Sequence, residues 1–202
     1  MVVITRYCHI RQQTLRDGDN ILFQNAAVSL DEFSEQAFRQ LGIQYPKFYK
    51  MDRASRLGIL AVEILLQNTN VSRQSPESVA VVLSNAHASL DTDLRYFETL
   101  KTIASPALFV YTLSNVVTGE ICIRHGFKGE NAFFVTSAFE PSTMAAYVDG
   151  VMEKNNTTSC IAGWVDVLGE QHDVFLYLAE KSKGGNGSWP HDSETIEKLY
   201  RS

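Results

Sequence analysis

Short apolar runs alternate along the chain with longer segments in which apolar residues recur at helical spacing. The runs that begin at Val79 and Ala132 are continuously apolar, which is typical of strands covered on both faces. Similar short runs recur elsewhere, so that the predicted strands are Val2–Thr5, Val79–Ser84, Ala132–Thr136, Cys160–Val167 and Val174–Leu178. This pattern predicts a sheet that is buried between layers of helices.

The segments between these runs predict helices. In the segment Asp52–Gln67, Asp52 stands at the N-cap position and the second half is apolar nearly all round, so we expect deep burial. The predicted helices are Asp31–Leu41, Asp52–Gln67, Thr92–Ile103, Leu108–Gly119 and Pro141–Lys154. Because strands and helices alternate in this order, we expect an α/β fold with a mainly parallel sheet.

The composition changes after residue 181. The stretch Lys183–Ser188 is rich in glycine and predicts a flexible linker, and Ser193–Tyr200 predicts two turns of helix. Ile196, Leu199 and Tyr200 would share one side of that helix. We therefore divide the chain into a domain over residues 1–181 and a linker with a short C-terminal helix or tail over residues 182–202. The tail either docks on the domain or stays loose.

Composition excludes several classes of protein. The 202 residues include 18 Lys and Arg against 23 Asp and Glu, a formal net charge of −5, which argues against a dedicated nucleic-acid binder. The first residues do not form a signal peptide, and no apolar stretch of about 18 residues could span a membrane. We therefore expect a cytoplasmic protein that does not bind membranes.

The chain also lacks the sequence signatures of metal, nucleotide and hydrolase sites. Its cysteines are Cys8, Cys122 and Cys160, too widely spaced for a zinc site and too few for a disulfide framework. We expect Cys122 and Cys160 to be packed and Cys8 to be partly exposed. The chain has no GxGxxG, GxxxxGK[ST] or GxSxG motif, so we expect no cofactor.

An ordered set of short motifs resembles the β-ketoacyl synthases, a family of the thiolase superfamily. The densest part is Ser105-Pro106, Phe109, Asn115, Gly119, Ile123-Arg124, Gly126, Gly129 and Asn131. Three other segments resemble the family's first strand, a helix start and its fourth strand: Val2–Thr5, Lys50–Ser55 and Cys160–Trp164. The resemblance spans about residues 1–180 and covers only the N-terminal half of the family's fold. It implies a five-stranded sheet of order 3-2-1-4-5, with the last strand antiparallel and helices on both faces.

The residue at the family's nucleophile position departs from the pattern. In the family a cysteine stands where the third strand meets the next helix, because amide groups there stabilise a thiolate and an oxyanion. The corresponding stretch here is Val135-Thr136-Ser137-Ala138-Phe139-Glu140, which aligns Ala138 with the cysteine. Ser137 lacks a visible activating base, and we expect Glu140 either to cap the helix or to complement its dipole. We therefore expect no catalytic residue here.

The family's second half, which supplies two histidines or a histidine and an asparagine to its active site, has no counterpart in the chain. We expect His125 to be a structural turn residue and His87 to be a solvated residue after a strand. The remaining histidines have no partner that the sequence identifies: His9, His172 and His191. The resemblance therefore implies half of an active site, without its nucleophile.

Two surfaces are candidates for binding partners. A local basic patch could dock an acidic acyl carrier protein, although solvated side chains at a helix start are the favoured interpretation: Lys47, Lys50, Arg53 and Arg56. In the family the third strand pairs across a two-fold axis with the same strand of another subunit. The corresponding residues here are Ala132, Phe133, Phe134, Val135 and Thr136. We therefore expect a homodimer, or a heterodimer with a complete synthase.

Two functions follow from the resemblance. The first is a non-catalytic accessory protein, similar to a chain-length factor, in fatty-acid or polyketide-type biosynthesis. The second is an active 3-oxoacyl-acyl-carrier-protein synthase or acyltransferase, working in a complex that supplies the missing groups. The absent cysteine and the absent second half favour the first.

Overall fold

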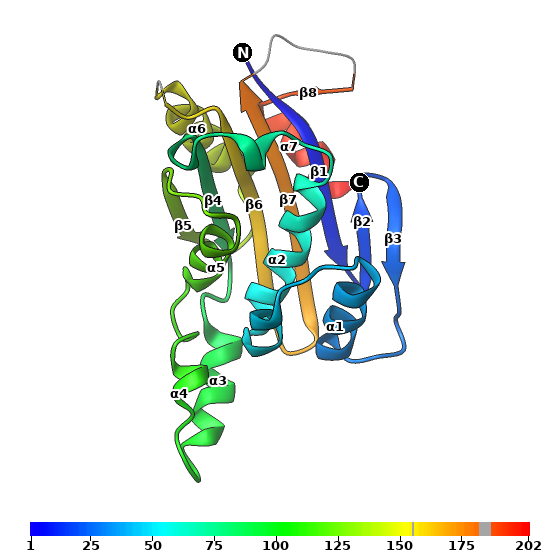
Figure 1. Cartoon of the computed structure of the whole chain (residues 1–202), viewed down its shortest axis with the longest axis vertical. Helices are drawn as coiled ribbons and strands as arrows, with labels where there is room; N and C mark the ends of the chain where they lie inside the picture. Colours follow the sequence, from blue (N-terminus) through cyan, green and yellow to red (C-terminus); the bar gives the residue numbers. More distant parts are fainter. Residues whose placement is uncertain (155, 182–186) are drawn as a thin grey trace.

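A single mixed sheet runs through the computed structural model, which describes residues 1–154, 156–181 and 187–202 (Figure 1). The strand order is β3-β2-β1-β7-β6-β4-β5, and β8 pairs with β1. The strands are β1 (Val2–Arg11), β2 (Thr14–Asp17), β3 (Asn20–Gln24), β4 (Val79–Asn85), β5 (Asn131–Val135), β6 (Ser159–Leu168), β7 (Gln171–Lys181) and β8 (Trp189–Pro190).

The strand directions confirm the α/β class and the antiparallel last strand, but the predicted strand order is wrong. β4 pairs in parallel with β5 and β6, whereas β7 runs antiparallel to both of its neighbours, β6 and β1. The five predicted strands therefore follow the order 3-2-4-5-1 instead of 3-2-1-4-5. β6 and β7 form a long hairpin, and β1 pairs with the other edge of β7. The β2–β3 hairpin, which the sequence did not predict, extends the sheet beyond β1.

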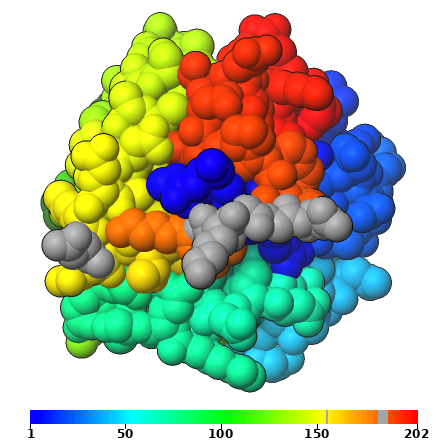
Figure 2. All heavy atoms as spheres, turned by 90° about the horizontal axis from the view of Figure 1, so that it is seen from above, coloured from blue at the N-terminus to red at the C-terminus, as the bar shows by residue number. Residues whose placement is uncertain are grey.

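Helices cover both faces of the sheet. They are α1 (Leu30–Gln40), α2 (Arg53–Leu66), α3 (Leu90–Thr99), α4 (Pro106–Phe109), α5 (Val116–His125), α6 (Pro141–Glu153) and α7 (Ser193–Arg201), with short 3-10 turns η1 (Pro46–Lys50), η2 (Val71–Arg73) and η3 (Pro76–Ser78). One apolar cluster joins α1, α2 and α5 to one face, and a second joins α6 and α7 to the other. Seen from above, the red segment of α7 lies on the side opposite the cyan-green segment of α2 (Figure 2). No helix among the described residues is long and apolar enough to cross a membrane.

The predicted helix Leu108–Gly119 is wrong, because the chain breaks there into two helices. α4 ends at Phe109, and α5 begins only after Asn115, which takes the N-cap position. α5 continues to Gly126, whose left-handed backbone (φ 73°) ends the helix. The apolar spacing across Leu108–Gly119 therefore spans a connection between two helices.

The N-cap predicted at Asp52 is confirmed and joins two helices. Its carboxylate accepts hydrogen bonds from the amide of Ser55 and from Thr92 Oγ1, each at 3.1 Å. Asp52 is buried, and this burial raises the pKa of its carboxyl group. The contact to Thr92 fixes the start of α3 against the start of α2.

The C-terminal segment docks on the sheet. Ile196 and Leu199 of α7 are buried in the same apolar cluster as α6. Before α7, His191 accepts or donates at both ring nitrogens: Nε2 lies 3.2 Å from Tyr177 Oη and Nδ1 lies 2.8 Å from Asp149 Oδ1. The predicted linker falls mostly on residues 183–186, outside the described residues. Of the two possibilities for the tail, the structure therefore shows docking.

Gly163 in β6 is the position where a side chain would damage the fold most directly. Its φ is +143°, and a Cβ atom would lie 2.0 Å from the backbone oxygen of Phe175. We expect Gly163→Ala to cost more than about 3 kcal/mol in the free energy of unfolding, measured by urea denaturation. Gly150→Ala in α6, where a Cβ meets nothing within 4 Å, should stabilise by about 0.5–1 kcal/mol. Equal effects of the two substitutions would contradict this assignment.

Candidate functional site

The junction between β5 and α6 lies at the carboxyl end of the parallel strands, where α/β sheets usually bind ligands. The backbone amide of Thr136 donates a 2.9 Å hydrogen bond to the backbone oxygen of Asn85, which connects the junction to the end of β4. Ala138 is exposed, and its backbone oxygen accepts a 2.8 Å hydrogen bond from Thr136 Oγ1. Ser137 is also exposed, and its hydroxyl has no hydrogen-bond partner within the part of the chain that the structure describes. Neither residue is placed as an activated nucleophile.

Phe139 fills the space beneath this junction. Its ring lies against those of Trp164, Phe175 and Tyr200, at centroid distances of 6.0, 5.6 and 4.8 Å. The cavity that remains beside the junction has a volume of about 10 Å³, too little for more than one water molecule. The junction therefore holds an aromatic cluster where an acyl-transfer enzyme would need room for its substrate.

Glu140 does not cap α6 as expected. It occupies the N-cap position, but its side chain makes no capping hydrogen bond. Its Oε2 instead accepts a hydrogen bond from Thr143 Oγ1 at 2.9 Å. The carboxylate still lies at the positive end of the helix dipole, where a negative charge is favourable.

The three cysteines lie away from the junction. Cys8 in β1 and Cys160 in β6 are fully buried, and burial raises the pKa of both thiols above the usual range. Cys122 in α5 is half-buried, and its pKa is also raised by burial. The packed positions of Cys122 and Cys160 agree with expectation, whereas the partial exposure expected for Cys8 is wrong.

A row of polar side chains crosses the same end of the sheet, on the face of α6 and α7. We call Arg11, Asp173, Asp166 and His87 the polar row. Arg11 stands opposite Asp173 in the strand register, and Asp173 stands opposite Asp166, so that the three side chains share one face. Arg11 Nε donates to Asp173 at 2.6 Å, and His87 Nδ1 lies 2.8 Å from Asp166 Oδ2.

His87 is therefore not the isolated, solvated residue that we expected. Asp166 Oδ1 accepts hydrogen bonds from the amides of Ala86 and His87, each at 3.0 Å, so one carboxylate orders the whole turn after β4. Residues 87 and 166 are far apart in the sequence, and no local pattern pairs them. His125 closes α5, where it is stacked on Phe127 and packed near Glu63, a structural role as expected.

The predicted carrier-protein patch is largely neutralised within the chain. Lys47 pairs with Glu120 at 2.7 Å, Arg53 with Asp31 at 2.7 Å, and Arg56 with carboxylates of α1. Among the four, Lys50 alone is exposed without a charged partner in the described residues. Carrier docking at these residues stays a prediction, and the internal ion pairs reduce the charge available for it.

The strand predicted to pair between subunits lies at the edge of the sheet. β5 pairs with β4 on one side, and its other edge has no partner among the described strands. The side chains of Ala132, Phe133 and Phe134 are half-buried, and Val135 is 54% exposed. The edge is therefore available for pairing, as its predicted role requires.

An apolar arm extends from the sheet next to this region. We give this name to residues 90–113, which comprise α3, α4 and the segments that follow each of them. These residues project from the body of the molecule (Figure 1). Large apolar side chains on the arm are exposed to solvent, among them Ile103 at 84%, Phe97 at 62% and Leu113 at 62%. A concentration of exposed apolar side chains of this kind is typical of surfaces that bind another protein, a membrane or a ligand.

Comparisons with solved structures show that the fold is similar to that of chains in ketosynthase and chain length factor structures. The ishigamide ketosynthase/chain length factor gives a TM-score of 0.65 at 15% identity, over 92% of this chain and 63% of that chain. The AntDE:AntF complex, a type II acyl-carrier protein with its ketosynthase, gives a TM-score of 0.61 at 16% identity, over 89% and 62%. This chain therefore spans less than two thirds of these two structures.

A third solved structure matches over nearly its whole length. One chain of the ketosynthase ApeO in complex with its chain length factor ApeC, from Xenorhabdus doucetiae, gives a TM-score of 0.57 at 13% identity. The match covers 100% of this chain and 91% of that chain, so the two are similar in length. No protein-family model and no curated protein matches the sequence.

Thiol reactivity tests whether any cysteine is activated. In the folded protein at about pH 8, we expect iodoacetamide to alkylate Cys8 and Cys160 at least about 100-fold more slowly than in the urea-unfolded chain. Burial excludes the reagent, and the raised pKa removes the thiolate. The half-buried Cys122 should react at an intermediate rate, read by peptide mass spectrometry. Fast modification of Cys160 in the native state would contradict the structure.

Proposed function

We propose that this chain is a non-catalytic, ketosynthase-like accessory subunit that binds a complete synthase in polyketide or fatty-acid biosynthesis. The observation that carries the proposal is the junction between β5 and α6. Ala138 has no group that could attack a thioester, and Phe139 occupies the space below it. Neither the unassisted Ser137 nor the three distant cysteines supplies a replacement.

One of the matched structures supports a role in such an assembly. In the complex of the ketosynthase ApeO with its chain length factor ApeC, the matched chain is covered to 91% by this one. A chain with a similar fold and of similar length therefore occurs in an assembly with a ketosynthase. We infer that this chain likewise acts as one subunit of such an assembly.

The free edge of β5 and the apolar arm are the surfaces that we assign to the partner. The edge offers unpaired backbone groups for a strand of the partner, and the arm offers exposed side chains such as Phe97 and Ile103. Both lie at the same end of the strand order, so that one partner can cover them together. Association would remove from water many large exposed apolar side chains, among them Phe97, Ile103 and Leu113.

We expect that this protein forms no covalent acyl-enzyme intermediate. The purified protein, incubated with acyl-coenzyme A or with an acylated carrier protein, should show no covalent acyl adduct by intact-mass spectrometry, because no activated nucleophile is present. A complete ketosynthase from the same genome, treated in the same way, serves as the positive control. An adduct on Ser137 or on any cysteine would establish the alternative, an active acyltransferase.

Association with a synthase is tested by charge substitutions at matched exposed positions. Val135→Asp on β5 and Phe97→Asp on the arm should each weaken binding to a complete ketosynthase from the same genome by more than about tenfold, because a buried charge would lack a partner. Ile21→Asp on β3, at the opposite edge and equally exposed at 52%, should leave the affinity unchanged. Analytical ultracentrifugation measures both. A stable homodimer that binds none of these synthases would overturn the heterodimer.

A further inference from the structure

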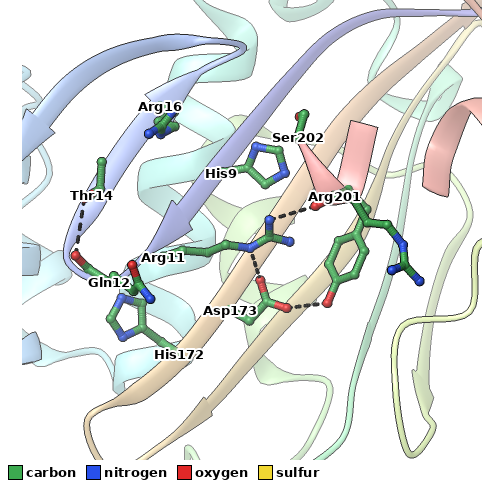
Figure 3. A pocket seen from close by; sticks show the side chains of 10 residues that line it. His9, Arg11, Gln12, Thr14, Arg16, His172, Asp173, Arg201 and Ser202 are labelled. Carbon is green, nitrogen blue, oxygen red and sulfur yellow. Dashed lines mark hydrogen bonds and ion pairs between the residues drawn. The ribbon is translucent and has the colours of Figure 1, made fainter. Parts of the chain in front are cut away.

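A cavity of about 790 Å³ lies beyond the C-terminal end of α7, between the β1–β2 turn and the start of β7 (Figure 3). It is separate from the β5 edge and the apolar arm, and Tyr200 of its lining contacts Phe139 of the junction at a centroid distance of 4.8 Å. Its volume falls within the range of sites for small organic molecules. Three arginines and two histidines line it, against the single acidic side chain of Asp173. In a chain of net charge −5, this concentration of cationic groups favours an anion.

Arg11 and Asp173 form a fixed wall of this cavity. Arg11 Nε donates to Asp173 Oδ1 at 2.6 Å, and Arg11 NH1 donates to the Tyr200 backbone oxygen at 2.7 Å (Figure 3). The Tyr200 hydroxyl also donates to Asp173, and its ring lies 4.6 Å from the Arg11 guanidinium carbon. The acidic side chain of Asp173 is thus already compensated by these contacts, so it does not repel a bound anion strongly.

Arg16 supplies a positive charge that the chain itself does not use. It stands directly opposite His9 in the β1–β2 register, so that both side chains lie on the same face of the sheet. Within the described residues its guanidinium makes no hydrogen bond and no ion pair, although it is half-buried. A half-buried guanidinium without a carboxylate partner is well suited to bind a carboxylate or phosphate group with two parallel hydrogen bonds.

His9 is a second, independent indication of a ligand. Its side chain lines the cavity but is only 2% exposed, held by stacking on Phe175 at a centroid distance of 5.0 Å. The buried Nε2 atom has no hydrogen-bond partner among the described residues. Burial, together with the positive charges of Arg11 and Arg16, lowers the pKa of His9 to about 4, so the ring is neutral near pH 7. Buried polar atoms are rarely left without a partner, and a ligand is one way to supply it.

We propose that this cavity binds a small organic anion, with its phosphate or carboxylate group held between Arg16, His9 Nε2 and the unoccupied NH2 group of Arg11. The guanidinium groups provide the charge, and the neutral imidazole provides a fixed polar contact at the wall. The remaining volume accommodates the organic part of the ligand beside the Tyr200 ring. The proposal is independent of the accessory role, because none of these residues belongs to the surfaces assigned to the synthase.

Calorimetric titration of the whole chain at low ionic strength tests the proposal. The probes are glycerol 3-phosphate, succinate and neutral glycerol. We expect at least one of the two anions to bind with a dissociation constant below about 10 mM, and glycerol not to bind. The two anions distinguish a phosphate site from a carboxylate site. No binding by either anion, or equal binding of glycerol, would overturn the proposal.

Substitutions of single residues test whether the anion binds in this cavity. Arg16→Gln should weaken binding of the anion at least tenfold, and His9→Phe, which keeps an aromatic ring against Phe175, should also weaken it. Arg73→Gln is the matched control, because Arg73 is an exposed arginine of η2 without an ion pair among the described residues. It should change the affinity less than twofold. Equal losses in Arg16→Gln and Arg73→Gln would show attraction to the overall charge only and would refute the site.

Discussion

The fold depends on covering both apolar faces of the central strands. Every residue of β4 is buried, and so are residues 174–179 of β7, with side chains that alternate between the two faces. α1, α2 and α5 cover one face, and α6 covers part of the other. α7 supplies additional cover on this second face, where Ile196 and Leu199 are buried. His191 fixes this cover by bridging Tyr177 of β7 and Asp149 of α6.

The need to cover this face of the sheet also explains why aromatic side chains are packed beneath the junction at Ala138. Phe139, Trp164, Phe175 and Tyr200 form one aromatic cluster that joins the junction, the sheet and α7. An active site at this position would need polar groups and an open volume beneath the nucleophile. The chain has instead a packed cluster, which contributes to holding α7 on the sheet. Phe139 thus has a structural function at this junction, because its ring joins the start of α6 to the sheet and to α7.

The sequence predicted those features that depend on neighbouring residues. Continuous apolar runs located the five main strands, and Asp52 located the start of α2, because strand burial and N-caps are local properties. The order of the strands could not be obtained in this way, since periodicity assigns a residue to a face but does not choose the neighbouring strand. The β2–β3 hairpin was missed because its residues are mostly polar or charged. In the candidate site, the alignment of Ala138 with the family's nucleophile stays a prediction from the motif order. The His87–Asp166 pair could not be predicted, because it joins segments that are distant in the sequence.

The positions of the two surfaces in the strand order determine whether they can act at once. The β5 edge and the cavity at β1, β2 and the start of β7 lie toward opposite ends of the sheet, with β4 and β6 between them. At about 4.8 Å per strand, the five steps from β5 to β2 separate them by roughly 24 Å. A partner that pairs with β5 and covers the apolar arm therefore extends the sheet away from the cavity. The cavity remains open in such an assembly, so that an anion at Arg16 and a subunit at β5 do not compete for space.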